Sequence, residues 1–197
     1  MKSRDDAQSH TALELSLLER NAYLEDVNKH FASMLDRLAS NGEFQNDLGK
    51  AKSENEVFEA TLSHIRKLLP LQVIGCLNSM DDGSFDLIAC DPADSRDSLN
   101  ILVNETIVNG SFSWALNKNQ LLESVDENDQ TVILHSISTR KRIRGMFISK
   151  MPSESGHLDS TMQNVLTVIL HTAAYALESL AYQKLLQDNL STLEERV

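Results

Sequence analysis

Apolar residues near the start of the chain recur at alternating intervals of three and four. They fall at Leu13, Leu17, Leu24, Val27, Phe31, Met34 and Leu38, and Arg20 interrupts the series. This heptad spacing places the apolar side chains on one narrow face, so it predicts a helix that associates with a second copy of itself. The alternative is a single amphipathic helix that packs on its own domain. Asn41-Gly42 predicts the end of this helix, because glycine readily adopts the left-handed backbone of a helix terminus.

A second long helical pattern occupies residues 158–197. Its first half is densely apolar, as in a helix that covers a sheet, whereas its second half narrows to about one apolar residue per turn. The narrow part comprises Leu186, Leu190, Leu193 and Val197. The pattern predicts a helix that leaves its domain and continues as a coiled coil. It reaches Val197 without a C-capping residue, so we expect the chain to be part of a longer protein; the alternative is a helix that frays at its end.

Shorter elements lie between these two helices. A capping box of Ser53 and Glu56 predicts the start of one helix, and Pro70 predicts its end. A loop is predicted at residues 91–98, followed by a helix over roughly residues 99–107. The remaining signals are for strands.

Five β-rich runs are predicted, at residues 71–79, 85–90, 121–125, 131–137 and 143–149. Asp81-Asp82-Gly83 joins the first two runs as a hairpin, and the basic turn Thr139-Arg140-Lys141-Arg142 joins the last two. The order is helix, two strands, helices, three strands and long helix. It predicts an α+β domain, with helices packed on a mostly antiparallel sheet and long helices at both ends.

Composition limits the partners and the compartment. Apolar residues make up 41% of the 197 residues, enough for a core, and the net charge is −11. Because this charge repels phosphate backbones and anionic lipids, we expect no nucleic-acid partner and no membrane contact. The first twelve residues contain no signal peptide, and polar residues interrupt the most apolar stretch, 162–180. We therefore expect a cytoplasmic protein, in which Cys76 and Cys90 are buried free thiols or, alternatively, a bridge between neighbouring strands.

Motifs of known catalytic chemistry are missing from the sequence. The seven glycines form no phosphate-binding loop, no G-x-S-x-G elbow occurs, and the six histidines lack metal-ligand spacing. We therefore expect no enzymatic activity, no metal and no cofactor. Ser63-His64-Ile65-Arg66 faintly resembles the phosphoacceptor box of histidine kinases, but the acid after the histidine is missing. We interpret His64 as a residue on the polar face of its helix.

Two stretches carry a resemblance to a known family. Residues 110–120 read Gly-Ser-Phe-Ser-Trp-Ala-Leu-Asn-Lys-Asn-Gln and begin with a short helical turn, and Arg144-Gly145-Met146-Phe147 follows the basic turn. With the order of elements, these stretches resemble a bacterial subgroup of GAF domains over roughly residues 53–183. Leu121 departs from the pattern, because many relatives have proline there. The resemblance implies a sensory module of bacterial signalling, of the type found in sensor histidine kinases and diguanylate cyclases.

The resemblance also implies a ligand pocket between one sheet face and residues 91–125. Strand alternation adds residues from the sheet to the aromatic ones of that segment. The candidate pocket residues are Cys76, Asn78, Phe112, Trp114, His135 and Arg144. Each has a plainer alternative: Trp114 and His135 as core residues, for example, and Arg144 as part of a solvated hairpin. The family's cyclic-nucleotide residues and bilin-bearing cysteine are missing, so the ligand is not identified.

Three hypotheses follow for function. The first is a sensory domain at residues 53–183, between an N-terminal dimerisation helix at 1–42 and a C-terminal output helix at 184–197 that leads to a kinase or cyclase domain. The second is a homodimeric scaffold that binds no ligand. The third is a GAF-fold enzyme similar to methionine sulfoxide reductases, which requires reactive cysteines near the pocket.

Overall fold

The computed structural model describes Arg20, residues 41–152 and residues 157–194, with side chains described as far as Ser191. The chain forms two compact units, Met1–Glu43 and Phe44–Val197. The predicted heptad seam between Leu13 and Leu38 lies outside the described residues. The sheet and its helices belong to the second unit.

The described residues contain a five-stranded antiparallel sheet, in the order β2-β1-β5-β4-β3. Its strands are β1 (Val73–Ser79), β2 (Phe85–Asp91), β3 (Leu122–Val125), β4 (Thr131–Ser138) and β5 (Ile143–Lys150). All five predicted strands are confirmed. The predicted hairpin between β1 and β2 is also confirmed, and Gly83 adopts a φ of 83° in its turn, which glycine accommodates without strain.

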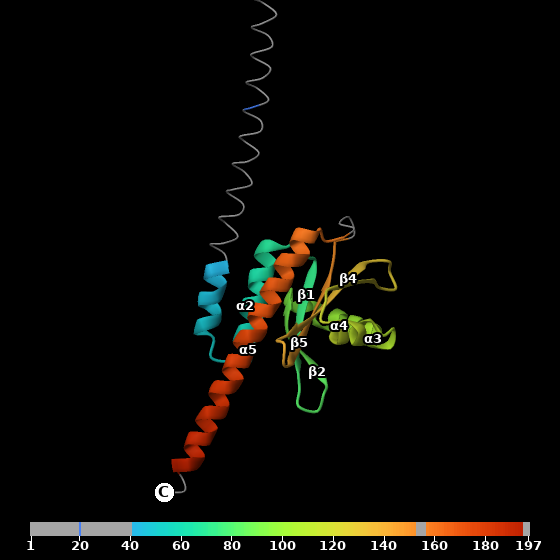
Figure 1. Ribbon diagram of the computed structural model, residues 1–197. Helices are drawn as coiled ribbons and strands as arrows, with labels where there is room; N and C mark the ends of the chain where they lie inside the picture. The colour runs from blue at the N-terminus through green and yellow to red at the C-terminus, as the bar shows by residue number, and fades with distance from the viewer. Residues whose placement is uncertain (1–19, 21–40, 153–156, 195–197) are drawn as a thin grey trace, which may run out of the picture. The chain divides into compact units, whose positions relative to one another are not determined.

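Helices cover both faces of the sheet (Figure 1). Helices α2 (Glu54–Leu68) and α5 (Ser160–Glu194) lie on one side, and α3 (Arg96–Val108) and α4 (Ser111–Lys118) lie on the other. A short 3-10 turn, η1 (Ala93–Ser95), leads into α3. The arrangement confirms the predicted α+β class, with helices on an antiparallel sheet and a long helix at the C-terminal end.

Each face of the sheet has its own apolar core, because β1 and β5 are central strands buried on both sides. Phe58, Ile65, Ile74, Phe147 and Leu170 are among the buried residues on the α2/α5 side. On the α3/α4 side the buried residues include Leu77, Leu99, Leu134, Met146 and Ile148. Successive side chains along a central strand therefore contribute in turn to one core and to the other.

The capping box of α2 is confirmed. The Glu56 N–H donates to Ser53 Oγ at 3.3 Å, and the Glu56 carboxylate accepts from the Lys52 N–H at 2.7 Å. The helix ends at Leu68, two residues before Pro70. Both ends of α2 thus follow from local sequence.

Three local predictions are wrong. Asn41-Gly42 does not end a helix, since residues 41–50 are helical and bury Phe44 and Leu48; this burial outweighs the cost of about 1 kcal/mol for glycine in a helix. The loop predicted at 91–98 ends early, because α3 begins at Arg96. His64 does not lie on an exposed polar face of its helix, since it is only 5% exposed. Its ring stacks on that of Phe44, with centroids 4.5 Å apart.

Helix α5 has two parts with different surroundings. Among the described residues it is the helix long and apolar enough, over Ser160–Ser191, to cross a membrane by length and composition alone. Leu166, Leu170 and Leu177 of its first part are buried in the α2/α5 core, as in the core helix of a soluble domain. Beyond Ala181 every described side chain is exposed, and Figure 1 shows this part extending past the sheet.

Candidate functional site

The six candidate pocket residues do not line one cavity. Cys76, Asn78 and His135 alternate with residues that face the α3/α4 core, so they lie on the α2/α5 side. Arg144 lies two residues before Met146 and four before Ile148 along β5, so alternation places it on the same side of the sheet as they are, the α3/α4 side. The pocket wall proposed from Cys76, Asn78, His135 and Arg144 is therefore divided between the two faces of the sheet.

The three residues on the α2/α5 side are enclosed by structure. Asn78 donates from Nδ2 to Glu54 of α2 at 3.0 Å. Cys76 is fully buried, and burial raises the pKa of its thiol far above the ordinary value. Its neighbour in sequence, Gly75, pairs with Cys90 across the strands, and Cys90 packs on the other core. Both thiols are free and face opposite sides of the sheet, so the alternative of a bridge between them is not observed.

The residues on the α3/α4 side differ in exposure. Phe112 is buried, and its ring packs edge-on against that of Phe85 with centroids 5.1 Å apart. Trp114 is 42% exposed, so the alternative that it fills the core is wrong. The Nε of Arg144 is buried without a hydrogen-bond partner among the described residues. Phe112 and Arg144 are thus the two candidates that remain on the face where the resemblance implies a ligand.

A polar group that sequence reasoning missed lies on this same face. The Asn119 side-chain oxygen accepts hydrogen bonds from the hydroxyls of Ser136 and Ser138, at 2.6 and 2.5 Å. Asn119 ends α4 with a left-handed φ of 50°, which directs the chain into β3. Ser138 pairs with Ile143, next to Arg144 in β5. The result is a polar end to an otherwise apolar face.

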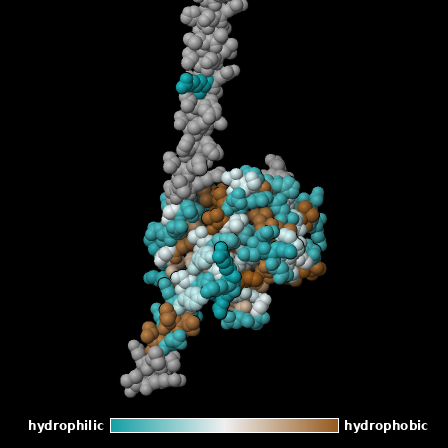
Figure 2. Space-filling model, in the orientation of Figure 1, coloured by the Kyte–Doolittle hydropathy of each residue, from teal (hydrophilic) through white to brown (hydrophobic). Residues whose placement is uncertain are grey.

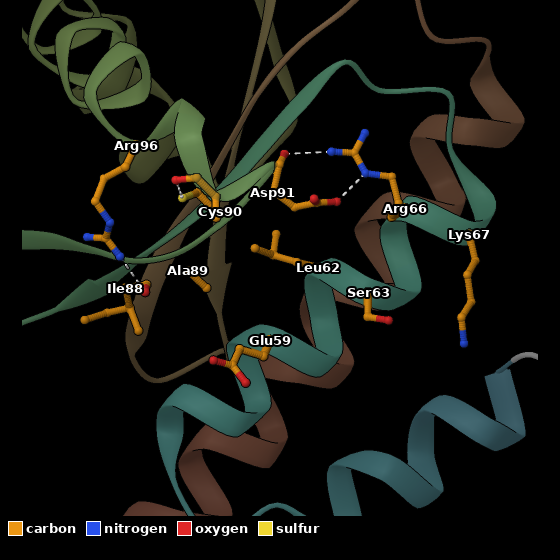
Figure 3. A pocket seen from close by; sticks show the side chains of 11 residues that line it. Glu59, Leu62, Ser63, Arg66, Lys67, Ile88, Ala89, Cys90, Asp91 and Arg96 are labelled. Carbon is orange, nitrogen blue, oxygen red and sulfur yellow. Dashed lines mark hydrogen bonds and ion pairs between the residues drawn. The ribbon is translucent and has the colours of Figure 1, made fainter.

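A separate hollow of about 560 Å³ lies at the edge strand β2, between α2 and the start of α3 (Figure 3). The Arg66 guanidinium binds the Asp91 carboxylate and donates to the Asp91 carbonyl at 2.6 Å. Arg96 donates to the carbonyls of Leu87 and Ile88 at 2.7 and 3.1 Å. The two arginines therefore occupy backbone carbonyls of an edge strand, which makes that edge less available for pairing with another chain.

None of the six candidates lines this hollow. The sequence feature that could have indicated this hollow is the basic last turn of α2, which contains Arg66. No local pattern shows that Asp91 lies next to Arg66. The Cys90 thiol in this hollow lies 3.7 Å from the Ala93 carbonyl oxygen. Among the described residues, no group of three or more His, Cys, Asp or Glu side chains is arranged to hold a metal ion.

The contact between β4 and α5 contains a pair of histidines. His135 is 1% exposed, and its ring centroid lies 6.0 Å from that of His171 in an edge-to-face arrangement. His135 Nδ1 lies 2.7 Å from the Ser136 carbonyl oxygen, and Nε2 lies 3.3 Å from Thr167 Oγ1. Burial lowers the pKa of His135 from its ordinary value of 6.5, and the charge of His171 lowers it further. His135 is therefore kept neutral at the surface where α5 meets the sheet.

We expect His135 to make the free energy of unfolding fall as the pH is lowered. Because the folded-state pKa of His135 is lowered, the unfolded chain binds a proton more readily, so the contribution is complete above pH 6.5 and is lost as the pH falls below it. Urea unfolding of the wild type and of His135→Gln, between pH 7.5 and 5.5, measures this. The variant should be less stable at pH 7.5 but should lose less stability on acidification. Parallel profiles would contradict the assignment.

No protein-family model and no curated protein sequence matches this chain. Solved structures do match it. The GAF domain of the potassium sensor histidine kinase KdpD from Escherichia coli has a TM-score of 0.56 at 12% identity, covering 75% of this chain and 97% of that one. The GAF domain of a phosphoenolpyruvate-protein phosphotransferase from Coxiella burnetii has a TM-score of 0.59 at 10% identity, covering 76% and 97%.

A GAF domain/HD domain protein from Geobacter sulfurreducens is also similar, with a TM-score of 0.55 at 14% identity over 68% of this chain and 98% of that one. Nearly the whole of each matched chain is covered, so the likeness extends over a complete domain. The chain has a GAF-like fold, as the sequence resemblance implied.

Proposed function

We propose that this chain is a non-catalytic sensory domain of a bacterial signal-transduction protein, in the first instance a cytoplasmic histidine kinase. It forms a homodimer through its terminal helices and relays the state of an unidentified ligand or partner to a downstream kinase or cyclase domain. GAF domains of a sensor histidine kinase and of a phosphotransferase are among the structures of the same fold. The fold does not by itself define a function, so the proposal depends on the geometry of α5.

Helix α5 carries the proposal, because it is a continuous helix of 35 residues with two roles. Its first part is buried on the sheet, where Thr167 and His171 contact His135. Its last described part projects with Leu185, Leu186 and Leu190 exposed, and Figure 2 shows the apolar surface that gathers there. A change in packing at the sheet would rotate or shift the same helix at its projecting end.

A sensory role needs a place for a ligand, and the polar end of the α3/α4 face is the one we favour. Arg144 offers a buried Nε without a partner among the described residues, and its neighbour in sequence, Ile143, pairs with Ser138, one of the two serines bound by Asn119. A buried donor without a partner is unusual, since such groups are nearly always hydrogen-bonded. A small molecule with an acceptor oxygen would satisfy it.

Two observations support a non-catalytic role over a reductase. The Cys76 thiol is buried and protonated, so it lacks the thiolate that such chemistry uses. Cys90 lies on the opposite face and is not positioned to resolve an oxidised Cys76. A turnover assay with free methionine sulfoxide should show no activity.

Native mass spectrometry of freshly purified protein tests the proposal, because it reports oligomer mass and retained ligand together. We expect a dimer. Additional mass on the dimer would support a sensor and begin to identify its ligand, whereas a dimer without it would favour the scaffold hypothesis. A monomer at all concentrations would contradict the proposed relay.

Charged substitutions at Leu190 and Leu193 test where the subunits meet. Because burial of each leucine contributes about 1.5–3 kcal/mol, replacing both by lysine in both subunits should weaken the dimer at least a hundredfold while the domain stays folded. Sedimentation equilibrium measures the change, and circular dichroism checks the fold. Lys184→Glu, a charge change elsewhere on the same helix, is the matched control and should have little effect. An unchanged dimer in the leucine variant would refute the C-terminal coiled coil.

A further inference from the structure

A hollow of about 540 Å³ lies between the β4–β5 turn and the part of α5 that leaves the sheet. Its walls are Thr139, Arg140 and Lys141 on the turn, and residues 175–186 on the helix. None of the six candidate pocket residues lines it, and it shares no residue with the hollow at β2. The proposed function gives this hollow no role.

The helical wall of the hollow contains a buried carboxylate. Glu178 is only 7% exposed, and it lines the hollow together with Tyr175 and Tyr182. Its side chain takes part in none of the ion pairs or hydrogen bonds that the described residues form with one another. Because burying a charge without a partner is strongly unfavourable, this carboxylate points to a bound cation.

The opposite wall is basic. Arg140 and Lys141 are exposed on the turn, and neither forms an ion pair with Glu178 across the hollow. Thr139 is buried, and its Oγ1 accepts from the N–H groups of Lys141 and Arg142, at 3.3 Å each. Since both of these bonds use the oxygen as an acceptor, the hydroxyl proton is left to donate to a ligand. The two walls therefore carry opposite charges.

Apolar surface accompanies these charges. Tyr175 and Tyr182 are 56% and 53% exposed. They are seven residues apart, about two helical turns, so both rings lie on one face of α5. Half-exposed aromatic rings beside a hollow offer a surface on which an apolar group can pack.

We propose that this hollow binds a small zwitterion with an apolar body, namely an apolar α-amino acid. Its ammonium binds Glu178, and its carboxylate binds Arg140 and the Thr139 hydroxyl. Its side chain packs on Tyr175 and Tyr182. An amine without a carboxylate would face the cations of the turn, and a carboxylate without an amine would face Glu178, so neither matches both walls.

The inference goes beyond the proposed function, whose ligand lies on the other side of the sheet. An amino acid in this hollow would join the β4–β5 turn to α5 at the point where the helix begins to project. It would thereby hold the helix against the sheet, independently of a ligand on the α3/α4 face.

Isothermal titration calorimetry with the full chain tests the ligand class. The probes are L-leucine, L-methionine and L-phenylalanine, and we expect at least one of them to bind. For that amino acid, the same molecule without its amino group and the same molecule without its carboxyl group should each bind about tenfold more weakly or worse, because each loses one charge-assisted contact. If none of the three binds, or if either truncated molecule binds as tightly as its parent, the proposal is overturned.

Glu178→Gln tests the residue that binds the ammonium. It should weaken binding by about tenfold or more, and in this variant removing the amino group from the ligand should cost no further affinity, because both changes remove the same contact. Glu127→Gln, which removes a charge from an exposed loop, is the matched control and should bind as the wild type does.

Two further outcomes would overturn the assignment. Without ligand, Glu178→Gln should unfold at the same temperature as the wild type or higher, because it removes a buried charge that has no partner; a lower temperature would mean that the carboxylate has a structural role. Binding that survives Glu178→Gln but is lost in Arg144→Gln would place the amino acid on the α3/α4 face. That result would overturn this inference while the proposed function stands.

Discussion

Replacing Gly145 by alanine is expected to lower the free energy of unfolding by about 3 kcal/mol. A Cβ at this position would lie 2.2 Å from the backbone carbonyl oxygen of Leu77. Both residues belong to paired central strands, β5 and β1, so neither backbone can move without disturbing the sheet. The close approach, and not an unusual backbone angle, is what requires glycine here.

Urea unfolding monitored by circular dichroism measures the effect. Gly49→Ala is the matched control, because a Cβ there meets no atom within 4 Å and the residue is helical. It should be neutral or stabilising by up to about 1 kcal/mol, since alanine favours a helix more than glycine does. If Gly145→Ala is as stable as the wild type, the backbones of β1 and β5 can move apart at this point without cost, and the expectation is wrong.

Replacing Asn119 by alanine is expected to cost about 2 kcal/mol, from two sources of comparable size. The buried hydroxyls of Ser136 and Ser138 lose their shared acceptor. Alanine must also adopt the left-handed φ of 50°, which asparagine tolerates better. The substitution therefore loosens the link between the end of α4 and β4 on the face where we place the ligand.

Asn119→Gly separates the two sources. Glycine removes the side-chain acceptor but accepts the left-handed backbone, so it should be more stable than Asn119→Ala by about 1 kcal/mol while remaining less stable than the wild type. Thermal unfolding of the three proteins at one pH makes the comparison. If the glycine variant matches the wild type, the hydrogen bonds to the serines contribute nothing to stability.

Most of the fold followed from local signals. The capping box at Ser53, the hairpin turn at Asp81-Asp82-Gly83 and the five β-rich runs each depend on a few neighbouring residues, and each is present in the structure. The local predictions that failed were overridden by distant contacts. Residues 41–50 are helical, and Phe44 among them stacks on the ring of His64, a contact that no local pattern reveals.

The candidate site depended more on tertiary structure. Alternation correctly grouped Cys76 with Asn78, and Arg144 with Met146, but it did not show which groups share a face. Cross-strand register decided that: Cys76, Phe147 and His135 pair across three strands, so they lie on the α2/α5 side and leave Arg144 on the other. Asn119 could not be linked to Ser136 and Ser138 without knowing how α4 returns to the sheet.

The sequence by itself determined the elements, their order and the α+β class, because turn residues, caps and apolar periodicity act over short distances. It also showed that the C-terminal helix has an apolar seam. Tertiary structure decided that the candidate residues are divided between the two faces of the sheet and that Trp114 is exposed. Those outcomes depend on how strands pair and which side of a helix the sheet covers, and both are set by contacts between residues far apart in the chain.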